Sequence, residues 1–218
     1  MKINILYEDN HLLVLNKPAE IATMGAKPGE PSLIYDAKEY IKKKYNKPGN
    51  VFLGVVSRLD SFVSGVIVFA RTSKAAKRLN EQFANHTTEK KYRLLIEKGL
   101  HPASGTWEDY LLKDDLHRRM RTVSAKTPGA RKGILHYKTL RDHGKFKLIE
   151  VYLETGRKHQ IRAQFSEHGF PIIGDRKYDS PRKWPVGIAL HSQSLTIAHP
   201  ISKEAMTFTA PLPDAWQT

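Results

Sequence analysis

The sequence lacks cysteine altogether, which excludes disulfide bonds, thiolate nucleophiles, Cys-ligated zinc and iron–sulfur clusters. It also lacks a long hydrophobic run, because no apolar stretch approaches the roughly 18 residues that a membrane-spanning helix requires. The opening segment, MKINILYEDNHLLVLNKP, is interrupted by charged residues and does not resemble a secretory signal. We therefore expect a protein of the cytoplasm that does not enter a membrane.

Acidic residues are comparatively few: 22 Asp and Glu against 36 Lys and Arg give a formal net charge of +14. This excess indicates a negatively charged partner. Nucleic acid is the leading candidate, and an anionic membrane surface or an acidic protein is the alternative. Much of the excess lies in the segment 117–147, named here the basic tract, where Asp142 is the one acidic residue. Its basic residues are Arg118, Arg119, Arg121, Lys126, Arg131, Lys132, Lys138, Arg141, Lys145 and Lys147.

Proline and glycine within the basic tract argue against a continuous basic helix lying on a membrane. The residues concerned are Pro128, Gly129 and Gly133. The tract instead predicts short strands joined by a basic turn, either holding nucleic acid or forming a solvated charged face.

The hydrophobic pattern predicts an α+β fold class built on a largely antiparallel mixed sheet. Apolar runs at 3–7 and 12–15 predict a hairpin, and the continuous apolar run 65–70 predicts a strand buried on both faces. Ser32 and Ser73 are predicted to cap two amphipathic helices, and a third helix is predicted over 158–168. Further strands are predicted at 92–96, 107–111, 134–140, 146–154, 187–191, 195–198 and 206–209.

Several chemical motifs are missing. The sequence contains neither a G-x-x-x-x-G-K-[ST] loop nor a G-x-G-x-x-G loop, so nothing supports nucleotide binding through a glycine-rich turn. It also contains no H-E-x-x-H, and its ten histidines show no ligand spacing. We therefore expect neither a metal nor a cofactor.

Two segments combine charged residues with tight turns. In the first, Arg58 and Asp60 precede Ser64-Gly65 at the start of the buried strand, so Asp60 is either a structural ion-pair partner or a reactive carboxylate. In the second, TGRKHQIR at 155–162 places a strand end, a glycine and a helix start among cations. Backbone N–H groups and positive charge there suit a phosphate.

Four ordered blocks in this chain resemble the RluA family of RNA pseudouridine synthases. They are SRLDSFVSGVIVFAR at 57–71, Lys90-Lys91-Tyr92, TGRKHQIR at 155–162 and GFPIIGD at 169–175. The opening Tyr7-Glu8-Asp9 and VLNKP at 14–18 are also similar to the family's start, so the likeness covers nearly the whole chain. The resemblance implies the pseudouridine synthase fold, in which helices and loops flank the sheet and an active-site cleft lies between two lobes.

The resemblance also implies residue roles. Asp60 corresponds to the family's catalytic carboxylate, Arg162 to its ion-pair partner, and Tyr92 to a tyrosine that stacks on the target base. Ile161 corresponds to apolar packing on that base, and Arg58 to a residue that enters the stack after the uridine is flipped out. The sequence leaves three steps open for Asp60: attack on the anomeric carbon, attack on the base, or removal of the 2′ proton.

RNA binding is implied for further cations. Arg157, His159 and Gln160 of the second segment, and Arg118, Arg119 and Arg121 of the basic tract, are expected to contact substrate RNA, either ribosomal or transfer RNA. We expect a monomer in which residues 1–218 form one catalytic domain without a separate N-terminal RNA-binding domain.

The chain departs from the family pattern at Ser57, where histidine is usual, and at Val63, where threonine is usual. Because Asp60, Tyr92 and Arg162 are all retained, the sequence nevertheless predicts an enzyme that isomerises specific uridines in RNA to pseudouridine. The alternative is a catalytically impaired RNA-binding or RNA-chaperone protein that retains the fold. A nucleoside or glycoside hydrolase is disfavoured, because no second catalytic acid accompanies Asp60 and an arginine would keep its pKa low.

Overall fold

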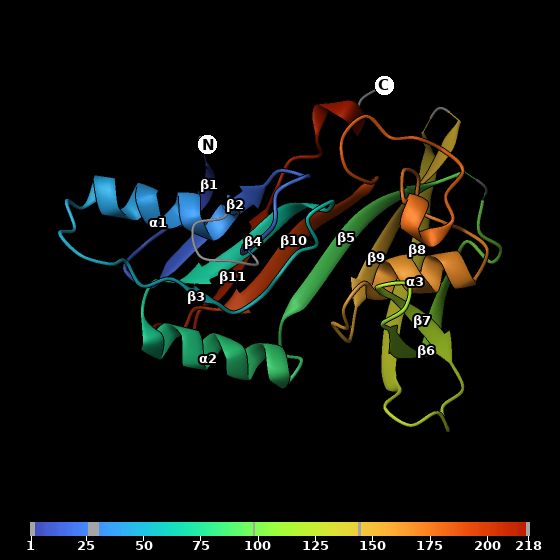
Figure 1. Cartoon of the computed structure of the whole chain (residues 1–218), viewed down its shortest axis with the longest axis horizontal. Helices are drawn as coiled ribbons and strands as arrows, with labels where there is room; N and C mark the ends of the chain where they lie inside the picture. Colours follow the sequence, from blue (N-terminus) through green and yellow to red (C-terminus); the bar gives the residue numbers. More distant parts are fainter. Residues whose placement is uncertain (1–2, 26–30, 98, 144, 217–218) are drawn as a thin grey trace. The chain divides into compact units, whose positions relative to one another are not determined.

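A computed structural model describes residues 3–25, 31–97, 99–143 and 145–216. Its contacts divide the chain into two compact units. Unit 1 comprises Met1–Glu89 and Ser192–Pro213, and unit 2 comprises Lys90–His191 and Asp214–Thr218. The strands are largely antiparallel and helices pack on them, which confirms the predicted α+β fold class (Figure 1).

Unit 1 is a sheet with a helix on each face. Its strand order is β1-β2-β4-β10, with β11 paired to β10 and β3 paired to β4. The elements are β1 (Asn4–Glu8), β2 (Leu12–Lys17), α1 (Leu33–Lys44), β3 (Gly54–Val55), β4 (Ser64–Ala70), α2 (Ser73–Ala84), β10 (Leu190–Ala198) and β11 (Ala205–Thr209).

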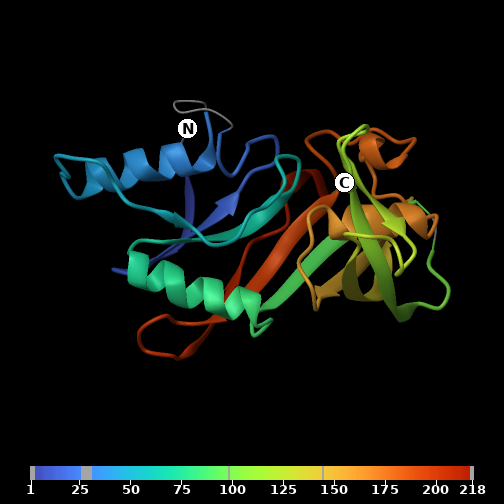
Figure 2. The same ribbon diagram turned by 60° about the horizontal axis from the view of Figure 1, so that its bottom comes forward.

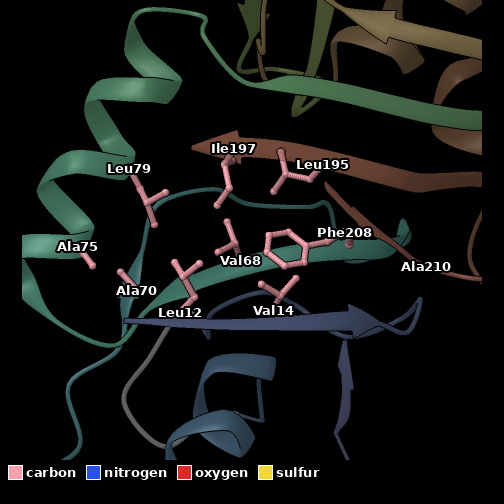
Figure 3. Close-up of a cluster of buried hydrophobic side chains, with 11 residues drawn as sticks. Leu12, Val14, Val68, Ala70, Ala75, Leu79, Leu195, Ile197, Phe208 and Ala210 are labelled. Atoms are coloured by element: carbon pink, nitrogen blue, oxygen red, sulfur yellow. The ribbon is translucent and has the colours of Figure 1, made fainter. Parts of the chain in front are cut away.

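Successive side chains of the central strands of unit 1 point to opposite faces of the sheet, and they form one buried cluster on each face. On one face, Leu12, Val14 and Val68 pack with Leu79 of α2 and Phe208 of β11, as Figure 3 shows. On the other face, the intervening residues of β2 and β4 pack with the buried stripe of α1: Leu13, Leu15, Ile67, Phe69, Leu33, Ala37 and Ile41. Every residue of β4 is buried, which confirms the strand predicted at 65–70.

Unit 2 is an antiparallel sheet with strand order β5-β9-β8-β6-β7. Helix α3 packs on the face that carries Leu111 of β6, and Trp107 of the same strand contacts Phe165 of α3 with ring centroids 4.8 Å apart. Its elements are β5 (Glu89–Ile96), β6 (Ser104–Asp114), β7 (Arg119–Val123), β8 (Arg131–His143), β9 (Phe146–Leu153), α3 (Gln160–Glu167) and the short 3₁₀ helices Arg176–Tyr178 and Asp214–Trp216.

Several predicted boundaries differ from the structure, and three of these differences have a clear local cause. Helix α2 is capped by Thr72, whose Oγ1 accepts a hydrogen bond from the Ala75 N–H, and not by Ser73. The strands predicted at 187–191 and 195–198 are one strand, β10, because its polar centre stays paired in the sheet, with Ser194 opposite Thr209 of β11. Lys158 lies before α3, because His159 adopts a left-handed conformation (φ 51°) that starts the helix later.

Candidate active-site residues in the two units

Asp60 lies in a tight turn between β3 and β4 of unit 1. Its Oδ1 accepts hydrogen bonds from the Phe62 N–H at 3.2 Å and from the Ser61 hydroxyl at 3.3 Å. Its carbonyl accepts from the Val63 N–H at 3.1 Å, which closes the turn. The side chain is half-buried. The hydrogen bonds within the turn fix the orientation of its carboxylate.

Thr23 anchors the chain just before this turn. Its Oγ1 donates to the Leu59 carbonyl at 2.8 Å and accepts from the Leu59 N–H at 3.2 Å, as a neighbouring strand would. No pattern in the sequence distinguishes Thr23 from other threonines, so this anchor could not be predicted. It restrains the residue directly before Asp60.

Lys17 is a second anchor of the Asp60 turn and is fully buried. Its Nζ donates to the carbonyls of Pro18 (2.9 Å), Ile21 (2.8 Å) and Ser61 (3.1 Å). Burial lowers the pKa of Lys17 to about 8, while the negative charge of Asp60 opposes that shift. Near neutral pH, Lys17 therefore places an ammonium charge close to Asp60. Its place in the block VLNKP was the only sequence signal for it.

Arg162 of unit 2 is held by Asp175, a partner for which the sequence pattern gave no indication. Its Nε and Nη2 donate to the two carboxylate oxygens of Asp175 at 2.6 and 2.7 Å, and both side chains are almost completely buried. The guanidinium carbon also lies 4.7 Å from the ring centre of Tyr178. This fork-to-fork geometry fixes the plane of the guanidinium group. Asp175 is the last residue of the block GFPIIGD, and its place in that block is the only feature of the sequence that distinguishes it.

Tyr178 links Arg162 to His159. Its hydroxyl oxygen accepts a hydrogen bond from the Met120 N–H at 2.9 Å and lies 2.9 Å from His159 Nδ1. A hydroxyl group can both accept and donate hydrogen bonds, so the Tyr178 hydroxyl connects the Met120 backbone to the His159 ring. The contact with Tyr178 restrains the orientation of the half-buried His159 ring.

Gln160 is placed differently from the other predicted RNA contacts, because its amide is buried within the loop before α3. Its Oε1 accepts from the Thr155 hydroxyl at 2.8 Å and from the Arg157 N–H at 3.0 Å, and its Nε2 donates to the Ile134 carbonyl at 3.1 Å. Gln160 therefore shapes the loop that carries Arg157. The backbone N–H of Arg157 is likewise used inside the protein.

Tyr92 lies on β5 of unit 2, opposite Val151 of β9, which in turn lies opposite Tyr137 of β8. Directly opposed residues share a sheet face, and Tyr137 contacts Trp107, which contacts α3. Tyr92 is therefore on the face of the sheet that α3 covers. Helix α3 also carries Ile161, which is buried.

The predicted RNA contacts outside these networks differ in exposure. Arg58 in unit 1 is exposed, as are Arg118 and Arg121 in the basic tract of unit 2. Arg119 is half-buried and its Nη1 lies 3.5 Å from Asp179. Turning the view by 60° shows β6, β7 and the turn that joins them at one edge of unit 2 (Figure 2).

The described residues hold no group of three or more His, Cys, Asp or Glu side chains arranged to bind a metal ion. Among the same residues, no helix has the length and apolar character needed to cross a bilayer.

The family model described as RNA pseudouridylate synthase matches residues 11–167. The "Uncharacterized RNA pseudouridine synthase YhcT" of Bacillus subtilis is 34% identical over 215 residues, covering 97% of this chain and 69% of the relative. The "Ribosomal large subunit pseudouridine synthase D" of Zymomonas mobilis is 32% identical over 227 residues, covering 99% of this chain and 71% of the relative.

Solved structures are similar in fold. "Human RNA Pseudouridylate Synthase Domain Containing 4" superposes with a TM-score of 0.81 at 23% identity, over 98% of this chain and 90% of that one. "Human RNA Pseudouridylate Synthase Domain Containing 1" gives a TM-score of 0.76 at 20% identity, over 97% and 84%. The expected pseudouridine synthase fold is confirmed.

Proposed function

The chain belongs to the RluA family of RNA pseudouridine synthases, enzymes that isomerise uridine in RNA to pseudouridine, and we propose that Asp60 is the carboxylate with which it does so. The single observation that supports this role most strongly is the Asp60 turn. It holds one half-buried carboxylate by two bonds to Oδ1, with the Lys17 ammonium nearby. A fixed, ionised carboxylate suits attack on the sugar or base, or removal of a proton.

We further propose that Tyr92 and Arg162 act in the same reaction. Arg162 has a guanidinium plane already fixed by Asp175, so it can hold a second anion without losing further side-chain freedom. Asp60 is the anion that we propose for it, and this pair keeps the carboxylate ionised. Tyr92 supplies a ring for stacking on the flipped base, and Ile161 supplies apolar contact to it.

Substrate RNA is proposed to contact Arg58, Arg118, Arg119, Arg121, Arg157 and His159, with Gln160 positioning Arg157. Ribosomal RNA and transfer RNA are both candidate substrates, and we propose that the two units work as one catalytic domain, as a monomer, in the cytoplasm. Family membership favours the enzyme over the impaired RNA-binding protein, the second candidate, which Ser57 and Val63 had suggested.

The test compares Asp60→Asn with Asp115→Asn, an exposed aspartate outside the four blocks. Pseudouridines are mapped in RNA from cells with the gene, without it, and rescued by each variant. We expect Asp60→Asn to reduce formation by roughly 10²–10⁴-fold or more while Asp115→Asn restores it. The map also shows whether the modified RNA is ribosomal or transfer RNA.

Full modification in cells rescued by Asp60→Asn would contradict the catalytic role. Growth rescue by Asp60→Asn, with no tritium released from uracil-5-labelled RNA by the unaltered protein, would instead support the impaired RNA-binding protein. Free uracil as the product would support a hydrolase.

A further inference from the structure

Among the described residues of unit 2, Lys90 and Arg157 have no acidic partner, in contrast to several cations close to them in the sheet. Lys91 and Arg93 on the same strand share Glu150 at 3.7 and 2.8 Å, and Lys132 lies 2.7 Å from Glu108. Within the four described ranges of the chain, no carboxylate lies within 4.0 Å of the ammonium of Lys90 or the guanidinium of Arg157.

The two unpaired cations lie beside each other. The Lys90 Nζ is 3.6 Å from the position that a Cβ would occupy on Gly156, the residue directly before Arg157. Arg157 is held from both ends, since its Nε donates to the Lys132 carbonyl at 3.0 Å and its backbone N–H donates to Gln160 at 3.0 Å. The position of the guanidinium is therefore fixed by the fold.

Holding these charges together is unfavourable for the protein alone. Lys90 is half-buried, and burial together with the positive charge of Arg157 lowers the pKa of Lys90. Like charges held close and without a counterion are stabilised when an anion binds between them. For a protein that acts on RNA, the anion in reach is a phosphodiester, which accepts hydrogen bonds from both side chains.

We propose that Lys90 and Arg157 together bind one phosphodiester group of the substrate RNA. Lys90 and Tyr92 are two residues apart on β5 and share a face of the sheet, so their Cα atoms lie about 7 Å apart. The bound phosphate therefore belongs to RNA close to the base that Tyr92 is proposed to contact. This inference rests on the proposed function, and it assigns Lys90 a role in holding the substrate.

The test measures binding of a uridine-containing single-stranded RNA by fluorescence anisotropy between about 50 and 200 mM salt. The variants are Lys90→Gln, Arg157→Gln, their combination, and Lys91→Gln as the matched control. Lys91 is the adjacent lysine on the opposite face, already paired with Glu150. We expect Lys90→Gln to weaken binding roughly tenfold and to reduce the salt slope by about 0.7, and Lys91→Gln to do neither.

The combined variant tests whether the two cations share one phosphate. If they do, losing the second cation weakens binding less than losing the first, so the effects are not additive. An unchanged salt slope in Lys90→Gln, an equal fall in Lys91→Gln, or full additivity would each overturn the inference.

Pseudouridine formation by the same proteins separates this inference from the proposed function. An active protein whose RNA binding does not depend on Lys90 refutes the phosphate site alone. A protein that forms no pseudouridine in any RNA, but whose binding shows the expected dependence on Lys90, retains the phosphate site and refutes the proposed function.

Discussion

At the scale of single residues, Lys17 is unusual because a fully buried lysine loses the hydration of its charge. Three carbonyl oxygens and the nearby Asp60 carboxylate compensate only in part, since the pKa of Lys17 still falls to about 8. Near neutral pH the native state thus keeps an ammonium group at a cost in stability. The compensating gain is a rigid connection between the end of β2 and the turn that holds Asp60.

This cost predicts a pH dependence of stability. Because the pKa of Lys17 is lower in the native state than its ordinary value of 10.5, the unfolded state binds more protons between about pH 8 and pH 10.5. The contribution of Lys17 to the free energy of unfolding therefore rises with pH across that window. We expect the stability of the unaltered protein relative to Lys17→Met to increase by about 2 kcal/mol from pH 7 to pH 10, measured by urea denaturation.

Subtracting Lys17→Met removes the titration of groups that both proteins share. These include Lys44, Lys91 and Lys132, whose raised pKa values act in the opposite direction at alkaline pH. A difference that stays constant or falls between pH 7 and pH 10 would show that Lys17 does not titrate as a buried ammonium.

Residues of the candidate site were predictable from the sequence where they stood in a motif, and their partners were not. Asp60, Tyr92 and Arg162 were identified by the blocks that surround them. Asp175 stands in the block GFPIIGD, but the block did not indicate what Asp175 does. Its bidentate contact with Arg162 depends on how the loop after α3 folds back on that helix. Thr23 bonds to a residue 36 positions away, a distance over which local pattern carries no information.

At the scale of elements, the start of β4 depends on Gly65. Its φ of 113° lies in a region that favours glycine, and a Cβ there would be 2.2 Å from the Ser192 carbonyl oxygen. Neither backbone can shift without breaking the sheet that β4 and β10 share in unit 1. Glycine is therefore required at this position because two strands approach each other closely there.

Gly65→Ala is therefore expected to destabilise the protein by about 3 kcal/mol or more, measured as a lower urea midpoint. Gly49→Ala is the matched control, because a Cβ at Gly49 has no atom within 4 Å. The control should change stability by no more than about 1 kcal/mol. Equal effects in the two variants would mean that the strand approach tolerates a side chain.

The elements themselves were mostly predictable, since hydrophobic period reports which face is buried. The first hairpin, both faces of β4 and the inner stripe of α1 follow that rule. The predictions were wrong where polar residues are compatible with two different local structures. Thr72 and Ser73 can each cap a helix, and only the extended backbone of Thr72 (φ −136°) decides between them. The polar centre of β10 likewise looks like a turn until its partner strand is known.

At the scale of the whole molecule, the net charge of +14 can act on RNA in two ways: by general electrostatic attraction and through specific contacts of particular side chains. The structure divides the arginines of the basic tract in this respect. Arg118 and Arg121 are exposed at the edge of unit 2, whereas Arg119 lies near Asp179 and is half-buried. The first two are the better candidates for phosphate contacts that release counterions.

Reversing both exposed arginines, as Arg118→Glu with Arg121→Glu, is therefore expected to weaken RNA binding and to reduce the salt slope by about 1 to 2. The control is Lys74→Glu with Lys77→Glu, on the exposed face of α2 near its N-terminal end, where acidic residues do not disturb a helix. Both pairs lower the net charge equally, so a general attraction would weaken binding equally. Anisotropy titrations of one RNA across a salt series distinguish the two cases. An equal fall in the salt slope for both pairs would mean that RNA binding depends on the total charge of the protein and not on specific contacts with the basic tract.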